Sequence, residues 1–295
     1  SWLLVITSAF IAFFAVWLIH PLLVKLALLK DIVDNPNHRK LQRNPVPVLG
    51  GVAVFFGISL ALGVTSPFYN STSLCIILGV MIVMLYVGTI DDIMGLSASI
   101  RLVIEVICVL LLTLVCQTSI NDFHSLWGIT QLSTWIAVPL TVFISVGIIN
   151  SINLIDGVNG LSSGFCIMAS AIFGCFFYYV GDYSMTILAA TCVGALIPFL
   201  LHNVFGKTSR MFIGDGGTLL MGMIMSVFVI HVLDSNSQMT DLTERGIGLI
   251  PFTMAVLVIP VFDTVRVMSS RIFRGRSPFM PDRTHLHHLF ISLGF

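Results

Sequence analysis

Long apolar runs alternate with short polar segments along the whole chain. Nine runs have about the 20 residues that an α-helix needs to cross the hydrocarbon core of a bilayer. Backbone polar groups must be hydrogen-bonded inside lipid, and the short alternating segments of a membrane β-barrel are absent, so the runs predict helices. The predicted spans are 2–23, 49–65, 73–90, 100–116, 134–149, 162–180, 185–204, 218–233 and 247–267. The pattern thus predicts an all-α fold, a polytopic transmembrane helix bundle.

Composition agrees with this pattern and excludes an ordinary soluble domain. Hydrophobic residues make up 57% of the 295 positions and charged residues 9%, and the mean hydropathy is +1.01. We therefore expect one integral membrane domain over residues 1–295. A net charge of zero favours no nucleic-acid partner. The six cysteines lie in or beside apolar runs without any Cys-x-x-Cys pair, which indicates packing residues rather than disulfides or zinc ligands.

Positive charge is distributed unequally between the two sides of the predicted bundle. When loops are assigned to alternate sides, only Arg245 of the 14 Lys and Arg residues falls on one side. The positive-inside rule makes the crowded side cytoplasmic. The first run begins at Trp2, exceeds a signal-peptide core and is followed by Lys25 and Lys30, so we interpret it as a span with an extracytoplasmic start.

A pair of carboxylates, Asp91 and Asp92, directly follows the third predicted span on the cytoplasmic side. Adjacent carboxylates repel each other and favour a nearby cation, and magnesium takes one or two carboxylates together with substrate phosphates. A solvated helix end is the alternative. Arg101 and Glu105 follow at i,i+4 spacing, which indicates a local ion pair.

The most polar stretch of the chain, residues 150–161, lies between two apolar runs. Asn150, Asn153 and Asp156 recur every three residues, so they share one face if the fifth helix continues. A turn built from Asn, Asp and Gly is the alternative. We favour a functional role because polar groups at a membrane boundary need a reason to be there.

A glycine-rich segment, residues 211–218, opens the eighth predicted span. Glycine backbone at a helix N-terminus suits a phosphate or another oxyanion, and Asp215 could bring Mg²⁺ to that phosphate. Asp215 could instead be only a helix cap. Phe212 could be a core residue or could stack on a base.

Basic residues mark the first and last cytoplasmic segments. Lys40 and Arg43 either attract a phosphorylated substrate or lie near anionic headgroups. The last segment is rich in arginine and histidine, which predicts an anion site; a stop-transfer flank and a zinc site are the alternatives. Its candidate ligands are Arg283, His285, His287 and His288. We interpret the remaining histidines within the spans, His20, His202 and His231, as packing residues.

Taken in order, these motifs resemble those of the polyprenyl-phosphate N-acetylhexosamine-1-phosphate transferases, the family of the MraY-type and WecA/TagO-type enzymes. The terminal His-x-His-His cluster is similar to that of the WecA-like undecaprenyl-phosphate GlcNAc-1-phosphate transferases. The chain differs at Asn159, where many members have a second Asp. Family members usually continue through further spans after the histidines, so we expect a domain truncated at its C-terminus.

The resemblance implies an enzyme at the bacterial cytoplasmic (inner) membrane, with its active site facing the cytoplasm. It would transfer GlcNAc-1-phosphate from UDP-GlcNAc to undecaprenyl phosphate, release UMP and initiate a cell-surface polysaccharide such as O-antigen. Mg²⁺, or Mn²⁺ in its place, is the implied cofactor. The implied partners are UDP-GlcNAc, undecaprenyl phosphate and the lipid bilayer, and a homodimer stays open.

Each candidate residue has an implied role. Asp215 and Asn153 would bind the metal ion. Asp91 or Asp92, both candidate catalytic residues, would orient or deprotonate the acceptor phosphate, and Asp156 would position the donor. The predicted substrate-binding residues are Asn150, Phe212, Arg283, His285, His287 and His288.

Two other functions stay open at this point. The same chemistry could use another UDP-sugar, such as UDP-GalNAc or UDP-MurNAc-pentapeptide. A membrane transporter is the alternative from another class, although transporters place polar groups near the midplane and in repeated halves. A non-catalytic membrane scaffold would not require this regular placement of carboxylates, asparagines and arginines.

Overall fold

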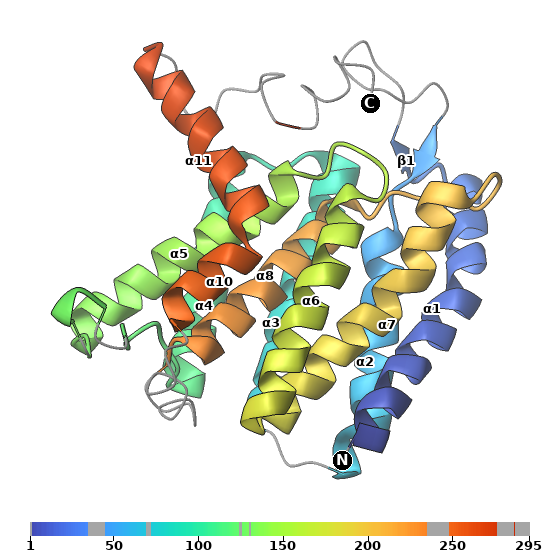
Figure 1. The fold of residues 1–295 in the computed structure, drawn as a ribbon. Helices are drawn as coiled ribbons and strands as arrows, with labels where there is room; N and C mark the ends of the chain where they lie inside the picture. Colours follow the sequence, from blue (N-terminus) through green and yellow to red (C-terminus); the bar gives the residue numbers. More distant parts are fainter. Residues whose placement is uncertain are drawn as a thin grey trace.

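The computed structural model is a bundle of long helices packed side by side, with two short strands at one end (Figure 1). It describes residues 2–34, 45–68, 72–123, 126–129, 131–234, 248–275 and 286. Eight helices within these residues are long and apolar enough to cross a membrane. The predicted all-α helix bundle is therefore confirmed.

The helices follow the predicted runs closely. They are α1 (Trp2–Leu29), α2 (Gly50–Thr65), α3 (Thr72–Met94), α4 (Ala98–Cys116), α5 (Thr134–Leu154), α6 (Leu161–Val180), α7 (Tyr183–Phe205) and α8 (Gly214–Val232), with short 3-10 turns η1 (Ser66–Phe68) and η2 (Leu126–Gly128). Side-chain caps explain some boundaries. Ser97 accepts the N–H of Ile100 at the start of α4, and Asp182 accepts the N–H of Met185 at the start of α7.

The two strands, β1 (Val33–Asp34) and β2 (Val46–Pro47), form an antiparallel pair. They lie at the end of the bundle where α1, α3, α5 and α7 finish and where α2, α4, α6 and α8 begin (Figure 1). We call this end the hairpin end. It gathers the polar ends of helices that are far apart in sequence.

Helix α8 is the centre of the bundle. It packs against α2, α3 and α5, and almost every residue from Gly214 to Val232 is buried. The rings of Phe173, Phe177 and Phe228 pack together between α6 and α8, with centroids 5.5 to 6.2 Å apart. A helix that is apolar on all sides is expected to be enclosed by others. The buried position of α8 fixes where its first residues lie.

Glycines allow α2 and α3 to approach the start of α8 very closely. A Cβ atom at Gly51 would lie 2.3 Å from the backbone N of Gly217, and one at Gly88 would lie 2.4 Å from the backbone N of Gly216. Real Cβ atoms do not come so near to backbone. The first turn of α8 is therefore held backbone to backbone by two other helices.

The ninth predicted span is a broken helix rather than one straight segment. α10 (Leu249–Val256) and α11 (Val258–Phe273) are bent by 76° at Leu257. Phe252 anchors α10 to α6, since its ring stacks on Phe176 at 4.8 Å. α11 projects from the hairpin end (Figure 1). Pro260 explains the break, because proline is tolerated in the first turn of a helix but not in the interior.

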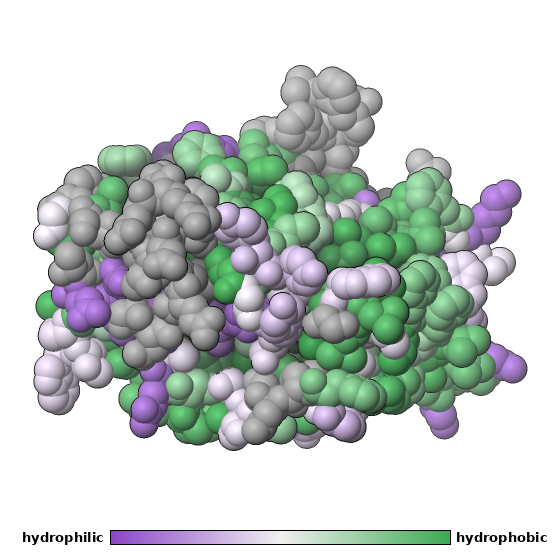
Figure 2. All heavy atoms as spheres, turned by 60° about the horizontal axis from the view of Figure 1, so that its bottom comes forward, coloured by the Kyte–Doolittle hydropathy of each residue, from purple (hydrophilic) through white to green (hydrophobic). Residues whose placement is uncertain are grey.

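The outer surface of the bundle is apolar, as a lipid environment requires. Figure 2 shows hydrophobic residues over much of the described surface on one side, with strongly hydrophilic residues at its margins. Along α1, Phe10, Phe14, Leu18 and Leu22 are all more than half exposed. In a soluble protein such a surface would be an aggregation hazard. Here it is the face that contacts lipid.

Candidate active site

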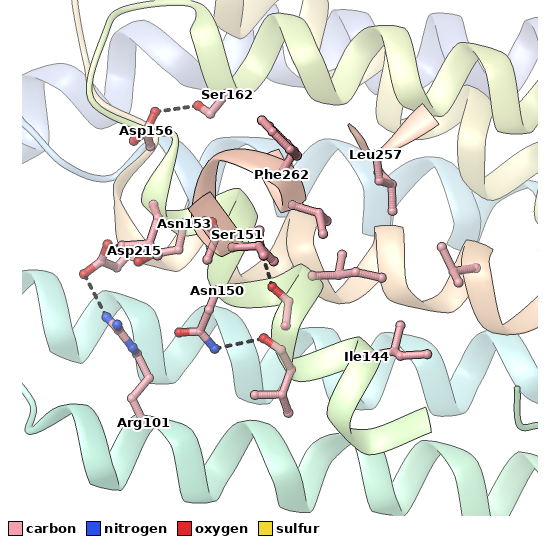
Figure 3. A pocket seen from close by; sticks show the side chains of 18 of the residues that line it. Arg101, Ile144, Asn150, Ser151, Asn153, Asp156, Ser162, Asp215, Leu257 and Phe262 are labelled. Carbon is pink, nitrogen blue, oxygen red and sulfur yellow. Dashed lines mark hydrogen bonds and ion pairs between the residues drawn. The ribbon is translucent and has the colours of Figure 1, made fainter. Parts of the chain in front are cut away.

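A large cavity of about 2120 Å³ opens at the hairpin end and continues between α4, α5, α8, α10 and α11. Polar side chains line its first part, and apolar side chains such as Ile144, Leu257 and Phe262 line the rest (Figure 3). The polar lining includes Asp34, Asp92, Arg101, Asn150, Asn153, Asp156, Asn159, Asn203, Arg210 and Asp215, and Phe212 also lines the cavity. The predicted site residues within the described part of the chain therefore converge, except that Asp91 lies just behind the lining, in contact with Arg101.

Asp92 closes the N-terminus of α8 from a different helix. Its Oδ1 accepts the N–H of Asp215 at 3.0 Å, and its Oδ2 accepts the N–H of Gly216 at 3.3 Å. Gly214 has a φ of +70°, and a Cβ there would lie 2.5 Å from Asp92 Oδ2, so this position needs glycine. A carboxylate at a helix N-terminus is stabilising by about 0.3–1 kcal/mol. The backbone oxyanion site predicted at this terminus is thus occupied by Asp92.

Asp215 and Asn153, the two predicted metal ligands, are in direct contact. Asn153 lies on the last turn of α5, and its Nδ2 donates to Asp215 Oδ1 at 2.7 Å and to Thr218 Oγ1 at 2.8 Å. Both N–H groups of the amide are therefore used. Among the described residues none donates a hydrogen bond to the Asn153 Oδ1, so this oxygen can serve a ligand.

Arg101 connects the two carboxylates that sequence reasoning left separate. Its Nη1 lies 2.9 Å from Asp91 Oδ2 and 3.8 Å from Asp215 Oδ2. The other oxygen of Asp91 accepts the N–H of Leu96 at 2.6 Å. The cation beside Asp91 is thus an arginine of the protein itself. The sequence analysis predicts for Arg101 only a local ion pair with Glu105. Its role in the site could have been inferred from its position on the same side of the membrane as the polar motifs.

Asp156 lies in the turn that follows α5. Its Oδ1 accepts a hydrogen bond from Ser162 on the first turn of α6. Burial is the main cause that raises the pKa of Asp156 from an ordinary 3.8 to about 6. The hydrogen bond from Ser162 opposes this change, and the negative charge of Asp215 adds to it. A carboxylate of this kind can change its protonation state near neutral pH.

The raised pKa of Asp156 predicts a pH-dependent stability. The folded protein holds this proton more tightly than the unfolded chain, so the stabilisation is fully present below about 4 and is lost as pH rises through about 6. Asp156→Asn, which stays neutral and keeps an acceptor for Ser162, should raise the melting temperature above pH 7 and change little at pH 4. Thermal unfolding in detergent with a chelator present measures this. Equal shifts at both pH values would contradict the assignment.

The backbone around Phe212 is fixed by neighbouring segments. The N–H of Phe212 donates to Pro47 O at 2.8 Å, and its carbonyl accepts the N–H of Gly50 at 3.0 Å. The preceding loop is held by two histidines: His20 Nε2 donates to Ser209 O at 2.8 Å, and His202 Nδ1 lies 2.8 Å from Ser209 Oγ. The His20 and His202 rings stack at 4.4 Å. These two histidines pack, as predicted, and they also anchor a loop of the cavity.

Some predicted ligands lie outside the described residues. They are Lys40, Arg43, Arg283, His285, His287 and His288. Between the histidines, the N–H of Leu286 donates to both carboxylate oxygens of Asp263, at 3.2 and 3.3 Å. Arg266 donates to the same carboxylate at 2.7 Å. Asp263 therefore connects the backbone at Leu286 to α11.

The donor set fits a magnesium ion that is shared with a substrate. Mg²⁺ takes one or two protein carboxylates and completes its coordination with water and phosphate oxygens. Among the residues that the structure describes, no group of three or more His, Cys, Asp or Glu side chains could hold an ion by itself. Asp215 with Asn153 offers one carboxylate and one amide oxygen beside Arg101. An ion here would need the phosphates of a ligand.

Comparison with known proteins gives a consistent result. The model of glycosyl transferase family 4 matches residues 74–233, which include the helices that carry Asp92, Arg101, Asn153 and Asp215. The undecaprenyl-phosphate alpha-N-acetylglucosaminyl 1-phosphate transferases of Salmonella typhi and Escherichia coli K12 are each 28% identical over 275 residues, covering 92% of this chain and 72% of theirs. A probable undecaprenyl-phosphate N-acetylglucosaminyl 1-phosphate transferase of Bacillus subtilis is 27% identical over 293 residues, covering 98% and 78%.

Proposed function

Because the chain belongs to glycosyl transferase family 4, we propose that it joins GlcNAc-1-phosphate to undecaprenyl phosphate. This family agrees with the one predicted from the motifs, and the chain is a multi-pass membrane phospho-sugar transferase. The donor would be UDP-GlcNAc and the products undecaprenyl-diphosphate-GlcNAc and UMP. The names of the relatives support undecaprenyl phosphate as the acceptor and N-acetylglucosaminyl 1-phosphate as the transferred group. The product would initiate a cell-surface polysaccharide.

One observation carries this proposal: a polar chamber and an apolar groove belong to the same cavity. Asp215, Arg101 and Asn150 line the chamber, while Val142, Phe143 and further residues of α5, α10 and α11 line the groove. A lipid phosphate needs both, since its head is charged and its tail is hydrocarbon. A soluble nucleotide sugar needs only the chamber. The two substrates can therefore meet at the hairpin end.

The reaction is a phosphoryl transfer with a simple balance. An oxygen of the acceptor phosphate bonds to the phosphorus that carries the sugar, the bond from that phosphorus to the bridging oxygen breaks, and UMP leaves with the bridging oxygen. We propose that Asp91 and Asp92 orient the acceptor side through Arg101 and the start of α8. Asp156 positions the donor, and Phe212 contacts the uracil. Arg283, His285, His287 and His288 are proposed to hold the diphosphate and the leaving group.

Charge is the main obstacle that the site must overcome. Three phosphates meet in a partly desolvated chamber, where like charges repel by several kcal/mol. Arg101 offsets part of this charge from its place between Asp91 and Asp215. We propose that Asp215 and Asn153 hold Mg²⁺, which when bound would neutralise diphosphate charge. Mn²⁺ could replace it.

We further propose that the hairpin end faces the cytoplasm of a bacterial inner membrane. The positive-inside rule supports this orientation, because the described basic residues Lys25, Lys30, Arg101 and Arg210 belong to this end. Nucleotide sugars are made in the cytoplasm, so this orientation gives the donor direct access.

The test of the proposed function is UMP release by the purified protein with undecaprenyl phosphate and Mg²⁺. A panel of UDP-GlcNAc, UDP-GalNAc and UDP-MurNAc-pentapeptide should show turnover with UDP-GlcNAc, and radiolabel from its sugar should enter the lipid phase. Turnover with another member alone would change the donor. Label that crosses a proteoliposome membrane without entering lipid would identify a transporter and remove the enzyme proposal.

If the groove holds the prenyl tail, a side chain added to it should raise KM for a long-tailed acceptor more than for a short-tailed one. Gly147 lines the cavity, and a Cβ there meets nothing within 4 Å. Gly147→Leu should therefore place a side chain in the groove without unfolding the protein, and raise KM for undecaprenyl phosphate about tenfold while sparing a short-chain prenyl phosphate. Steady-state kinetics with both acceptors measure this. Gly63→Leu, at an exposed glycine of α2 that also has open space, is the matched control. Equal effects on the two acceptors would contradict a tail-binding groove.

A further inference from the structure

Glu105 is a buried carboxylate for which the reaction described above has no role. It lies on α4 one turn after Arg101, and its side chain is only 1% exposed. A carboxylate inside a membrane-spanning helix is costly unless it is paired or hydrogen-bonded. Its two partners, Asn150 and Arg101, both line the chamber of the cavity. Glu105 itself does not line the cavity.

The first partner, Asn150, is held in one orientation by Glu105. The Asn150 Nδ2 donates to Glu105 Oε2 and to the carbonyl of Val146 at 2.9 Å. An amide has only two N–H groups, so both are used. The Oδ1 is left for a ligand, and Figure 3 shows this oxygen on the side of Arg101 and Asp215. Asn150 therefore offers the chamber an acceptor, which suits an N–H or O–H group of the donor and not a phosphate oxygen.

The second partner, Arg101, is in looser contact with Glu105. Glu105 Oε1 lies 3.7 Å from the Arg101 Nε, an ion-pair distance, and it accepts no hydrogen bond from the described residues. Arg101 donates its hydrogen bond to Asp91, at 2.9 Å. Glu105 therefore acts mainly on Asn150.

We infer that Glu105 is a positioning residue of the transferase: it makes Asn150 present its carbonyl oxygen to the nucleotide sugar. The inference rests on the proposed function. It assigns Asn150 to a hydrogen-bond donor of the sugar or base. Substrate contact belongs to Asn150, and Glu105 acts through it.

The test is a double-mutant cycle of Glu105→Leu and Asn150→Ala, read as kcat/KM for UDP-GlcNAc. Leucine should preserve the fold, because Arg101 keeps its 2.9 Å hydrogen bond to Asp91 and is not left as an unpaired buried charge. Each single variant should lose about 100-fold, and the double variant should lose no more than about threefold beyond Asn150→Ala alone. Glu105→Gln keeps an acceptor for Asn150 and should retain at least one tenth of the activity.

Controls separate this role from a structural one. Thr113→Val removes another buried polar group of α4, one without a hydrogen-bond partner in the described part of the chain, and should leave kcat/KM within twofold. Two results would overturn the inference and leave the proposed function intact. One is a double variant whose loss of kcat/KM equals the product of the two single losses. The other is a Glu105→Leu protein whose kcat/KM is within threefold of the natural value. A natural protein that releases no UMP from any UDP-sugar would overturn the proposed function, and this inference with it.

Discussion

Asp215→Asn should lower kcat/KM by about 1,000-fold or more while leaving the fold unchanged. Asparagine has nearly the same shape and keeps an oxygen that can accept from Asn153 Nδ2, so the 2.7 Å contact and the packing of α8 are preserved. The negative charge beside Arg101 is lost. A factor of 1,000 corresponds to about 4 kcal/mol of transition-state stabilisation, which is the scale for removing a charged group that acts directly on a transferring phosphate.

The measurement is UMP release across a range of Mg²⁺ concentrations, together with melting temperature and elution profile in detergent. Asp182→Asn is the control, because Asp182 also begins a helix, and asparagine can keep its hydrogen bond to the N–H of Met185. That variant should retain normal activity. If the Asp215→Asn protein kept a rate within tenfold of the natural one, Asp215 would be neither the metal ligand nor a residue that the reaction requires.

Gly88→Ala should reduce activity at least 100-fold and also destabilise the protein. The added Cβ would lie 2.4 Å from Gly216 N and 2.5 Å from Asp215 O. Both contacts are backbone atoms of α8, so no side chain can turn aside. Helix α3 must move away, and the two hydrogen bonds from α8 to Asp92, at 3.0 and 3.3 Å, must lengthen. Overpacking of this kind commonly costs about 1–3 kcal/mol.

Gly79 supplies a matched control on the same helix. A Cβ at Gly79 meets nothing within 4 Å, and alanine favours the helix by up to about 1 kcal/mol. Gly79→Ala should therefore be active and at least as stable as the natural protein. If Gly88→Ala matched Gly79→Ala in both the UMP assay and thermal unfolding, the prediction would be wrong. The close packing of α3 on α8 would then not be needed to hold Asp92 against the start of α8.

The helices could be predicted from sequence because the bilayer imposes a strong constraint on each run of about 20 residues. The helical face predicted for Asn150, Asn153 and Asp156 holds for the two asparagines, because α5 continues to Leu154, but Asp156 lies past the helix end in the following turn. Both features depend on residues that are close in sequence. The break after α10 was missed because hydropathy is averaged over a window, although Pro260 lies inside the predicted span and is a signal of it.

The contacts between helices could not be predicted in the same way. Asp92 and the amides of Asp215 and Gly216 are more than 120 positions apart, and nothing local in either segment indicates that one caps the other. The same is true of Arg101, whose bond to Asp91 crosses the turn between α3 and α4. Sequence reasoning identified which residues are unusual for a membrane protein. The packing of glycines against α8 decides which of them meet.

The bend at Leu257 has a consequence for how a substrate reaches the chamber. Because α10 ends early and α11 turns away, Met254, Val258 and Phe262 line the cavity and are also half or more exposed, as is Phe143 on the facing α5. The groove therefore has a lateral opening toward the surrounding membrane. The proposed acceptor, diffusing in the plane of the leaflet, can enter through this opening with its tail and head together, so its hydrocarbon stays out of water.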